Sequence, residues 1–275
     1  MKQAEFIPSI SNKDWQKKKF HFPKNTLNVA TLFSGIGAIE HALKRLKLKS
    51  KIVFAGDIDP HVKDAYFANY NISQEDWHDD VTSFSAKKYR GKVDLLVGGS
   101  PCQSFSMAGR RGGMEDARGT LFYDFIRVVQ ECNPKIFIFE NVRGVINHDG
   151  GYTWRVMKDI FTSLSNYSWT FKILNSADYG MPQSRNRLFV VGIRKVIKGL
   201  RNVNKPFLFP QPIPLNKTMQ DFLEDHIDSS YYIGEKGIKF VTKIQNQRKH
   251  YTQINGQIAL CQKANQQTNW HGDFI

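Results

Sequence analysis

Short apolar runs alternate with stretches of helical spacing along most of the chain. The runs are rich in Val, Ile, Leu and Phe, and they cover residues 27–33, 52–55, 93–97, 136–139 and 188–191. The stretches between them carry apolar side chains at the spacing of a helix, and they cover residues 39–46, 61–69, 121–130 and 154–164. Buried strands separated by helices are typical of a parallel sheet covered on both faces. The pattern therefore predicts an open, doubly wound, mostly parallel α/β sheet.

The alternation stops after Lys198. Four prolines lie between residues 206 and 214, where we expect a linker or domain boundary. Beyond them come one short helical stretch and many Asn, Gln, Lys and Arg side chains; these types contact base edges and phosphates, and a solvated surface explains them equally well. We expect three parts: a basic N-terminal arm at 1–26, which either lies on phosphates or is a solvated tail, an α/β domain at 27–205, and a linker with the start of a smaller region at 206–275.

Charge and cysteine content narrow the choice of partner and compartment. The 275 residues contain 39 Lys and Arg against 25 Asp and Glu, a net charge of +14, which favours nucleic acid as a polyanionic partner; a merely basic soluble protein is the alternative. Three widely spaced cysteines make no disulfide framework, and no metal-ligand spacing occurs. Neither a signal peptide nor an apolar run of about 18 residues is recognisable. We expect an intracellular, metal-free protein without membrane spans.

The first candidate site is the glycine-rich turn after the first predicted strand, residues 33–38 (FSGIGA). Such a turn lets the backbone approach a nucleotide and presents helix N–H groups to it. Asp57 and Asp59 follow at the end of the second predicted strand, where a carboxylate can accept hydrogen bonds from ribose hydroxyls. The turn predicts a nucleoside cofactor, with NAD and S-adenosylmethionine both open.

The second candidate site is a cysteine placed just after the third predicted strand. Gly98 and Gly99 leave room for close approach, and Pro101 stiffens the chain immediately before Cys102. A Gly- and Arg-rich stretch follows at residues 109–113, suited to neutralising phosphates. A lone cysteine is more often a small buried hydrophobe, but this setting favours a nucleophile.

Two further charged sites lie at the fourth and fifth predicted strands. Glu140 follows the fourth apolar run, where burial would raise its pKa and let it hold a proton; a solvent-facing strand end is the alternative. Arg185 and Arg187 precede the fifth run and, at i and i+2 of an extended segment, point to one side and can hold one substrate together. A pair of surface arginines in salt bridges is the alternative.

Together these motifs resemble the DNA (cytosine-5) methyltransferases. Phe-x-Gly-x-Gly, the acidic strand end, Gly-x-Pro-Cys, Glu-Asn-Val and Gln-x-Arg-x-Arg occur in that family's order over about residues 27–194. The resemblance implies the S-adenosylmethionine-dependent methyltransferase fold, S-adenosylmethionine as cofactor and duplex DNA as partner. It also implies methyl transfer to C5 of a flipped-out cytosine in a specific sequence. By analogy, it suggests a bacterial restriction–modification enzyme in the cytoplasm, associated with the nucleoid through DNA.

The resemblance assigns roles position by position. It implies a cofactor pocket lined by Phe33, Ser34, Gly35, Gly37, Asp57, Ile58, Asp80, Val81 and Pro101, with Asp57 on the ribose and Asp80 near the adenine amino group. It implies Cys102 as the nucleophile, Glu140 on the cytosine ring nitrogen, and Arg185 and Arg187 positioning the base and the catalytic loop. It implies a mobile loop over residues 106–113 and DNA contacts from Gln103, Ser106, Arg110, Arg111 and Arg118.

The chain departs from the family pattern in three places. Thr31 stands where the family usually has an acidic residue, and Ala38 replaces a common glycine. The sequence ends at Ile275 without the arginine-containing motif and the Gly-Asn-x-Val helix that family members carry beyond their recognition region. We expect an incomplete enzyme: one subunit of a split enzyme with a second subunit as partner, a truncated chain, or a remnant that binds cofactor without turnover.

Readings from other classes stay open. A nicotinamide oxidoreductase explains the glycine turn but not Cys102 or Glu140. A noncatalytic DNA- or cofactor-binding subunit explains the length, and a tRNA-directed relative shares the catalytic motifs. The recognition sequence is not readable from these residues.

Overall fold

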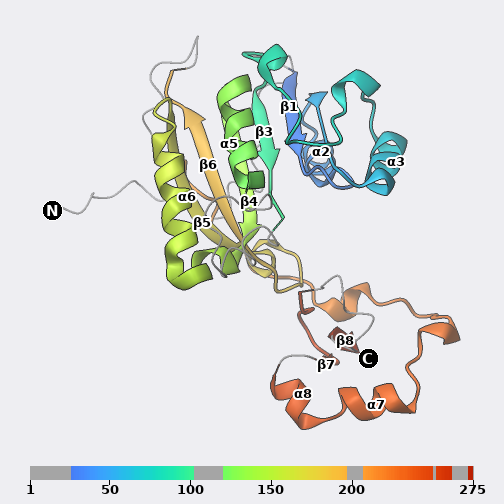
Figure 1. The fold of residues 1–275 in the computed structure, drawn as a ribbon. Helices are drawn as coiled ribbons and strands as arrows, with labels where there is room; N and C mark the ends of the chain where they lie inside the picture. The colour runs from blue at the N-terminus through green and yellow to red at the C-terminus, as the bar shows by residue number, and fades with distance from the viewer. Residues whose placement is uncertain (1–25, 102–119, 197–206, 250–251, 262–271, 275) are drawn as a thin grey trace. The chain divides into compact units, whose positions relative to one another are not determined.

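The computed structural model describes residues 26–101, 120–196, 207–249, 252–261 and 272–274 (Figure 1). The chain divides into two compact units. Of the described residues, those between 26 and 173 and between 187 and 209 form the sheet unit, and those between 174 and 186 and between 210 and 274 form the second unit.

A six-stranded sheet forms the centre of the sheet unit, in the order β2-β1-β3-β4-β6-β5. Neighbouring strands among β1 to β4 run parallel, while β6 runs antiparallel to β4. The mostly parallel α/β sheet predicted from the apolar runs is confirmed. The strands are β1 (Leu27–Leu32), β2 (Ser50–Phe54), β3 (Leu95–Gly98), β4 (Ile136–Val142), β5 (Tyr167–Asn175) and β6 (Asn186–Arg194).

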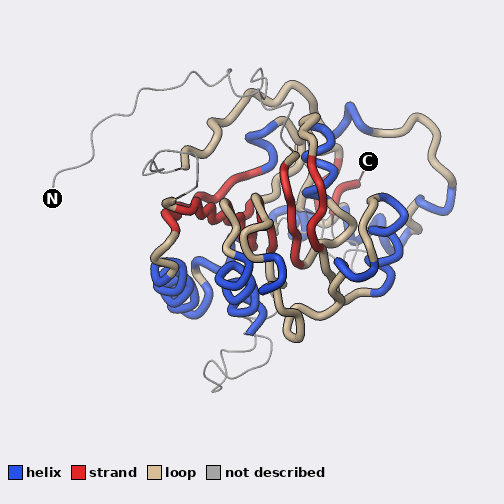
Figure 2. The backbone as a smooth tube through the Cα atoms, turned by 90° about the horizontal axis from the view of Figure 1, so that it is seen from above, coloured by secondary structure: helices blue, strands red, loops and turns tan. Residues whose placement is uncertain are grey.

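Among the described residues, four α-helices connect the strands and flank them (Figure 2). They are α2 (Ala38–Arg45), α3 (Pro60–Asn69), α5 (Thr120–Cys132) and α6 (Tyr152–Ser163), within two residues of the predicted stretches at their beginnings and ends. Local chemistry starts α3: Asp59 caps it by accepting a hydrogen bond from the His61 amide at 2.9 Å, and Pro60 occupies the first helical turn. Short 3₁₀ turns lie at Gln74–Asp76, Lys87–Tyr89, Arg143–Ile146, His148–Gly151 and Ser176–Tyr179.

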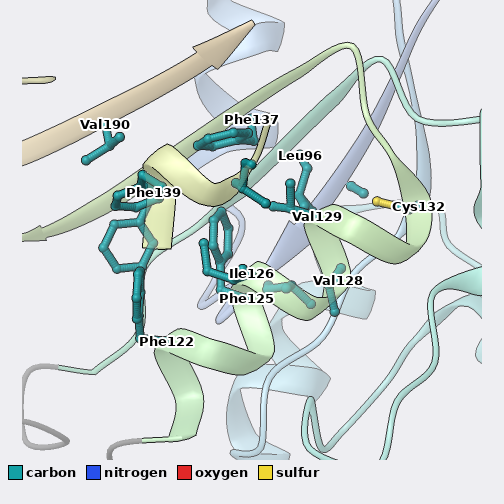
Figure 3. Close-up of a cluster of buried hydrophobic side chains, with 14 of the residues drawn as sticks. Leu96, Phe122, Phe125, Ile126, Val128, Val129, Cys132, Phe137, Phe139 and Val190 are labelled. Carbon is teal, nitrogen blue, oxygen red and sulfur yellow. The ribbon is translucent and has the colours of Figure 1, made fainter. Parts of the chain in front are cut away.

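An aromatic core fixes β4 against α5. Phe122 and Phe125 of α5 lie 5.4 and 5.1 Å, between ring centroids, from Phe139 of β4 (Figure 3). All three side chains are at most 1% exposed. Buried aromatic pairs of this kind contribute about 0.5–1.5 kcal/mol beyond the area they bury. The backbone of the next residue, Glu140, is therefore anchored by a rigid neighbour.

The structure corrects three expectations about elements. β4 continues through Glu140 to Val142, and β6 begins at Asn186, because the two strands pair with each other through Val142 and Arg187. β5 was not predicted. In the described residues beyond 215 there are two short helices rather than one, together with a small parallel sheet. The elements are α7 (Glu235–Val241), α8 (Ile244–Arg248), β7 (Thr252–Ile254) and β8 (Gly272–Phe274), with 3₁₀ turns at Met219–Phe222 and Ser229–Tyr231.

None of the helices in the described part of the chain combines the length and the apolar composition that a membrane span needs. The same residues contain no group of three or more His, Cys, Asp or Glu placed to hold a metal ion.

Candidate active site and cofactor pocket

The candidate residues gather at one edge of the sheet because parallel strands end there together. The glycine turn follows β1, Asp57 follows β2, and residues 99–101 follow β3. β6 runs the opposite way, so its beginning, with Arg187, reaches this edge beside the end of β4. This edge is where open α/β sheets bind their ligands.

Hydrogen bonds hold the glycine turn to the end of β2. The Ser34 amide donates to the Gly56 carbonyl at 3.0 Å, and the Ser34 hydroxyl bonds both the carbonyl and the amide of Gly56 at 3.0 Å. The Gly35 amide donates to Asp57 Oδ2, also at 3.0 Å. Phe33 has a φ of 55°, unusual for a residue with a side chain, so the fold accepts backbone strain at this turn.

Gly37 is the position in the turn where no side chain fits. Its φ is 84°, and a Cβ would lie 2.1 Å from Cε2 of Tyr70. The Tyr70 hydroxyl donates to the Gly37 carbonyl at 2.8 Å, so the residue at the end of α3 packs directly against the beginning of α2. The glycine pattern is thus required by packing as well as by backbone conformation.

The residues of this half of the edge fit a nucleoside. Half-buried Asp57 presents a carboxylate, and Ile36 of the turn and Ile58 next to Asp57 in the chain are 68% and 77% exposed, which is apolar surface suited to a base or sugar face. Asp80 accepts hydrogen bonds from the Thr82 amide and hydroxyl at 2.8 Å. Of the two acids predicted as ribose acceptors, Asp57 contacts the turn, whereas Asp59 caps α3.

The second half of the edge is built around Glu140. Arg187 Nε lies 3.0 Å from Glu140 Oε1, and the two side chains are 17% and 35% exposed, respectively. The Glu140 side chain is therefore only partly buried, and the rise in its pKa expected from burial stays a prediction. A Cβ on Gly99 would lie 2.8 Å from Glu140 Oε2, so only glycine permits this approach.

Asn141 connects β4 to the segment that leads to Cys102. Its side-chain amide donates to the Ser100 carbonyl at 3.1 Å, and its oxygen accepts from the Val142 amide at 2.8 Å. Asn141 and Ser100 are 2% and 4% exposed. The sequence analysis did not assign Asn141 a role, although a polar residue between the apolar positions of a buried strand is a usable signal.

Among the described residues, Arg185 and Arg187 contact different partners. Arg187 belongs to the sheet unit and pairs with Glu140. Arg185 belongs to the second unit, where its guanidinium contacts Cys261 Sγ at 3.8 Å and its amide donates to Asn175 Oδ1 at 2.9 Å. That Arg185 and Arg187 bind one substrate together stays a prediction.

Cys102 lies outside the described residues. So do the expected DNA contacts Gln103, Ser106, Arg110, Arg111 and Arg118.

A mostly parallel sheet with a glycine turn, an acidic strand end and a Glu–Arg pair at its carboxyl edge defines a class: α/β proteins with a nucleoside-binding site beside a polar reaction site. Within it, the chain belongs to the C-5 cytosine-specific DNA methylase family, whose model matches residues 27–272.

Curated relatives agree with this family assignment. An orphan methyltransferase, M.SPRI, from Bacillus phage SPR is 37% identical over 76% of this chain and 52% of its own length. The type II methyltransferase M.HhaI from Haemophilus parahaemolyticus is 36% identical over 72% of this chain and 57% of its own length. The chain spans about half the length of the curated relatives it matches.

Solved structures support the fold. The S. pombe Dnmt2 methyltransferase matches with a TM-score of 0.62 at 22% identity, covering 88% of this chain and 72% of the other. A Spodoptera frugiperda DNMT2 mutant matches with a TM-score of 0.68 at 20% identity, covering 90% of this chain and 74% of the other. The methyltransferase fold expected from the motifs is thereby confirmed.

Proposed function

We propose that the protein transfers a methyl group from S-adenosylmethionine to C5 of a cytosine in duplex DNA. The observation that carries the proposal is the Glu140–Arg187 pair, which lies on the same sheet edge as the segment leading to Cys102 and as the glycine turn with Asp57. Membership in the C-5 cytosine-specific DNA methylase family supports the same chemistry.

The first half of the edge holds the cofactor. The turn residues Phe33, Ser34, Gly35 and Gly37 line its pocket, Asp57 accepts from the ribose, and Asp80 with Val81 receives the adenine. Ile58 and Pro101, both exposed, cover the nucleoside and the methyl-bearing end. S-adenosylmethionine supplies an electrophilic methyl group on a sulfonium.

The second half activates the base, because cytosine C5 is a poor nucleophile by itself. The Cys102 thiolate adds to C6 while Glu140 protonates or hydrogen-bonds N3, and the resulting enamine is nucleophilic at C5. Arg187 holds the Glu140 carboxylate, and Arg185 holds the base and the loop. After the methyl group has bonded to C5, the C5 proton leaves and the C6–S bond breaks, which restores both the aromatic ring and the thiolate.

The substrate cytosine has to leave the helix, because Cys102 cannot reach C6 of a stacked base. The net charge of +14 supplies phosphate contacts, and Gln103, Ser106, Arg110, Arg111 and Arg118 contribute them around the flipped nucleotide. Residues 206–275 form the linker and part of a target-recognition region, and residues 27–205 the catalytic domain. A restriction–modification role in the bacterial cytoplasm, on nucleoid DNA, fits this partner.

The test is transfer of labelled methyl from S-adenosylmethionine to unmethylated bacterial duplex DNA by the purified chain, with 5-methylcytosine identified in the digest. Wild type and Cys102→Ala run side by side. Transfer that depends on Cys102 supports the proposal, and transfer without Cys102 contradicts it. Preference for tRNA over duplex DNA in a competition assay would move the substrate to RNA, and NADH binding would favour an oxidoreductase.

The alternative is a cofactor- and DNA-binding chain that turns over only with a second subunit. It predicts intact S-adenosylmethionine binding without transfer, and recovery of transfer when the product of a neighbouring gene is added.

A further inference from the structure

A buried carboxylate lies beneath the glycine turn. Glu40, in the first turn of α2, is 6% exposed. Its Oε1 accepts two hydrogen bonds, from the Thr31 hydroxyl at 3.0 Å and from the Tyr66 hydroxyl at 2.7 Å. Its Oε2 is buried and has no hydrogen-bond partner within the described part of the chain. Neither the motifs nor the proposed reaction assigns this residue a task.

From Glu40 the hydrogen bonds continue into the turn. Thr31 Oγ1 lies 2.8 Å from Ser34 Oγ, and Ser34 Oγ contacts the carbonyl and amide of Gly56, each at 3.0 Å. A hydroxyl has only one hydrogen to donate. Because Thr31 donates its hydrogen to Glu40, its oxygen is left to accept from Ser34, and Ser34 Oγ then remains bound to Gly56 by accepting from the Gly56 amide. The carboxylate thus sets the direction of hydrogen bonding in the side chains that hold the end of β1 to the end of β2.

We propose that Glu40 is a positioning residue for the cofactor: acting through Thr31 and Ser34, it holds the glycine turn at the separation from Asp57 that ribose binding requires. The inference rests on the proposed use of S-adenosylmethionine. The Gly35 amide donates to Asp57 at 3.0 Å, so a turn that shifts relative to β2 changes the distance between the turn and the ribose acceptor. Glu40 itself touches no part of the cofactor in this role.

Stability alone gives no reason to bury this carboxylate. Desolvating a charged group is costly, and apolar replacements of buried ionic groups are often neutral or stabilising. Tyr66 is fully buried, and burial first and Glu40 second raise the pKa of its phenol, so it remains a protonated donor. Glu40 therefore has two donors on one oxygen, one toward the turn and one away from it.

These two donors provide a matched pair of variants. Thr31→Val removes the hydroxyl that leads to the turn and leaves the Tyr66 bond in place. Tyr66→Phe removes the other hydroxyl and leaves Thr31 in place. Each variant deletes one buried hydrogen bond to the same Glu40 oxygen, and Thr31→Val also removes the contact with Ser34, so Thr31→Val should lower the melting temperature by at least as much as Tyr66→Phe.

The measurement is calorimetric binding of S-adenosylhomocysteine to the full chain, with melting temperatures recorded in parallel. We expect Thr31→Val to raise Kd by about tenfold, a loss the size of one hydrogen bond to a charged group, while Tyr66→Phe stays within about twofold. Glu40→Gln, which keeps the shape of the side chain but removes its charge, should resemble Thr31→Val. With S-adenosylmethionine as substrate it should raise KM about as much and change kcat little.

Equal Kd changes in Thr31→Val and Tyr66→Phe, or none in either, would reduce Glu40 to a packing role and overturn the inference. Wild-type chain that binds no S-adenosylhomocysteine overturns the proposed function along with it. Wild-type binding that Thr31→Val retains overturns the inference alone.

Discussion

The two halves of the sheet edge hold their polar groups in different ways. At β1 and β2, Ser34 is hydrogen-bonded to Gly56 and, through Thr31, to Glu40, which is 6% exposed. At β4 and β6, Glu140 and Arg187 form an ion pair whose carboxylate side chain is 35% exposed. In the first half, these polar groups are already hydrogen-bonded to one another without a ligand. In the second half, the charged groups remain partly accessible to a ligand. We infer that the cofactor half is preformed and that the base half is completed by its substrate.

The energies of the two halves differ accordingly. Each buried hydrogen bond of the cofactor half contributes about 0.5–1.5 kcal/mol net, and more to a charged partner. A partly exposed ion pair such as Glu140–Arg187 contributes about 0–1 kcal/mol. Substitutions in the first half should therefore affect folding and cofactor affinity together, and substitutions in the second should affect catalysis with little change in stability.

The largest effect should come from Cys102→Ala. We expect methyl transfer to fall by at least about 10³-fold, because no other group supplies the bond to C6. S-adenosylhomocysteine affinity should stay unchanged, since the thiol acts on the base. Transfer assays and calorimetry on one preparation measure both, and a cofactor affinity that falls together with transfer would contradict the independence of the two halves.

Glu140→Gln should come next, with transfer reduced by about 10²–10³-fold because the base loses its proton donor or acceptor. Stability should change by less than about 1 kcal/mol in urea titrations, since the ion pair is partly exposed. The matched control is Lys135→Gln, which breaks an ion pair to Asp94 (2.6 Å) ahead of β3 and β4. Equal losses of transfer in both variants would show a general effect of charge.

Gly37→Ala should lower the free energy of unfolding by about 1–3 kcal/mol and weaken cofactor binding. The new Cβ would lie 2.1 Å from Tyr70, and the φ of 84° is unfavourable for a residue with a side chain. Gly91→Ala is the control: its φ is 75°, and nothing lies within 4 Å of the added Cβ. Denaturant unfolding of both separates collision from backbone strain. A Gly37 variant no worse than the Gly91 variant would mean that Tyr70 moves aside freely.

The smallest effect concerns pH. Burial, with Lys88 adding to it and Asp76 and Asp79 opposing it, lowers the pKa of His78 to about 4. In the unfolded chain, His78 is protonated below about pH 6.5, whereas in the folded protein it stays neutral down to about pH 4. The free energy of unfolding should therefore fall as pH drops from about 6.5 to about 4. Because the ring is partly exposed, we expect a loss of only about 1 kcal/mol. His78→Phe preserves the stacking on Phe84 and should remove this part of the slope. Parallel slopes for wild type and variant in urea titrations would show that other groups cause the pH dependence.

Much of the fold was predictable because the apolar runs and helix starts are local signals. Strand β5 was overlooked although Tyr167, Trp169, Phe171 and Ile173 alternate with less apolar residues, the pattern of a strand. The extension of β4 past Phe139 has no local signal: it depends on pairing with β6, about fifty positions further along the chain.

The site shows the same division. Spacing and residue type were enough to select the glycine turn and Asp57, because both follow directly from a strand end. Glu40 could have been noticed, since it lies three residues before buried Leu43 on one face of α2. Its partners could not, because Tyr66 is 26 positions away and reaches it only through the packing of α3.

The boundary between the two units passes between Asn186 and Arg187. Ser176 and Arg185 face each other across the same turn, with the Ser176 amide donating to the Arg185 carbonyl at 3.2 Å. Two arginines one residue apart therefore belong to different bodies, one braced against Cys261 and the other against Glu140. Residues 185–187 are therefore a covalent link that carries one guanidinium group on each of the two units.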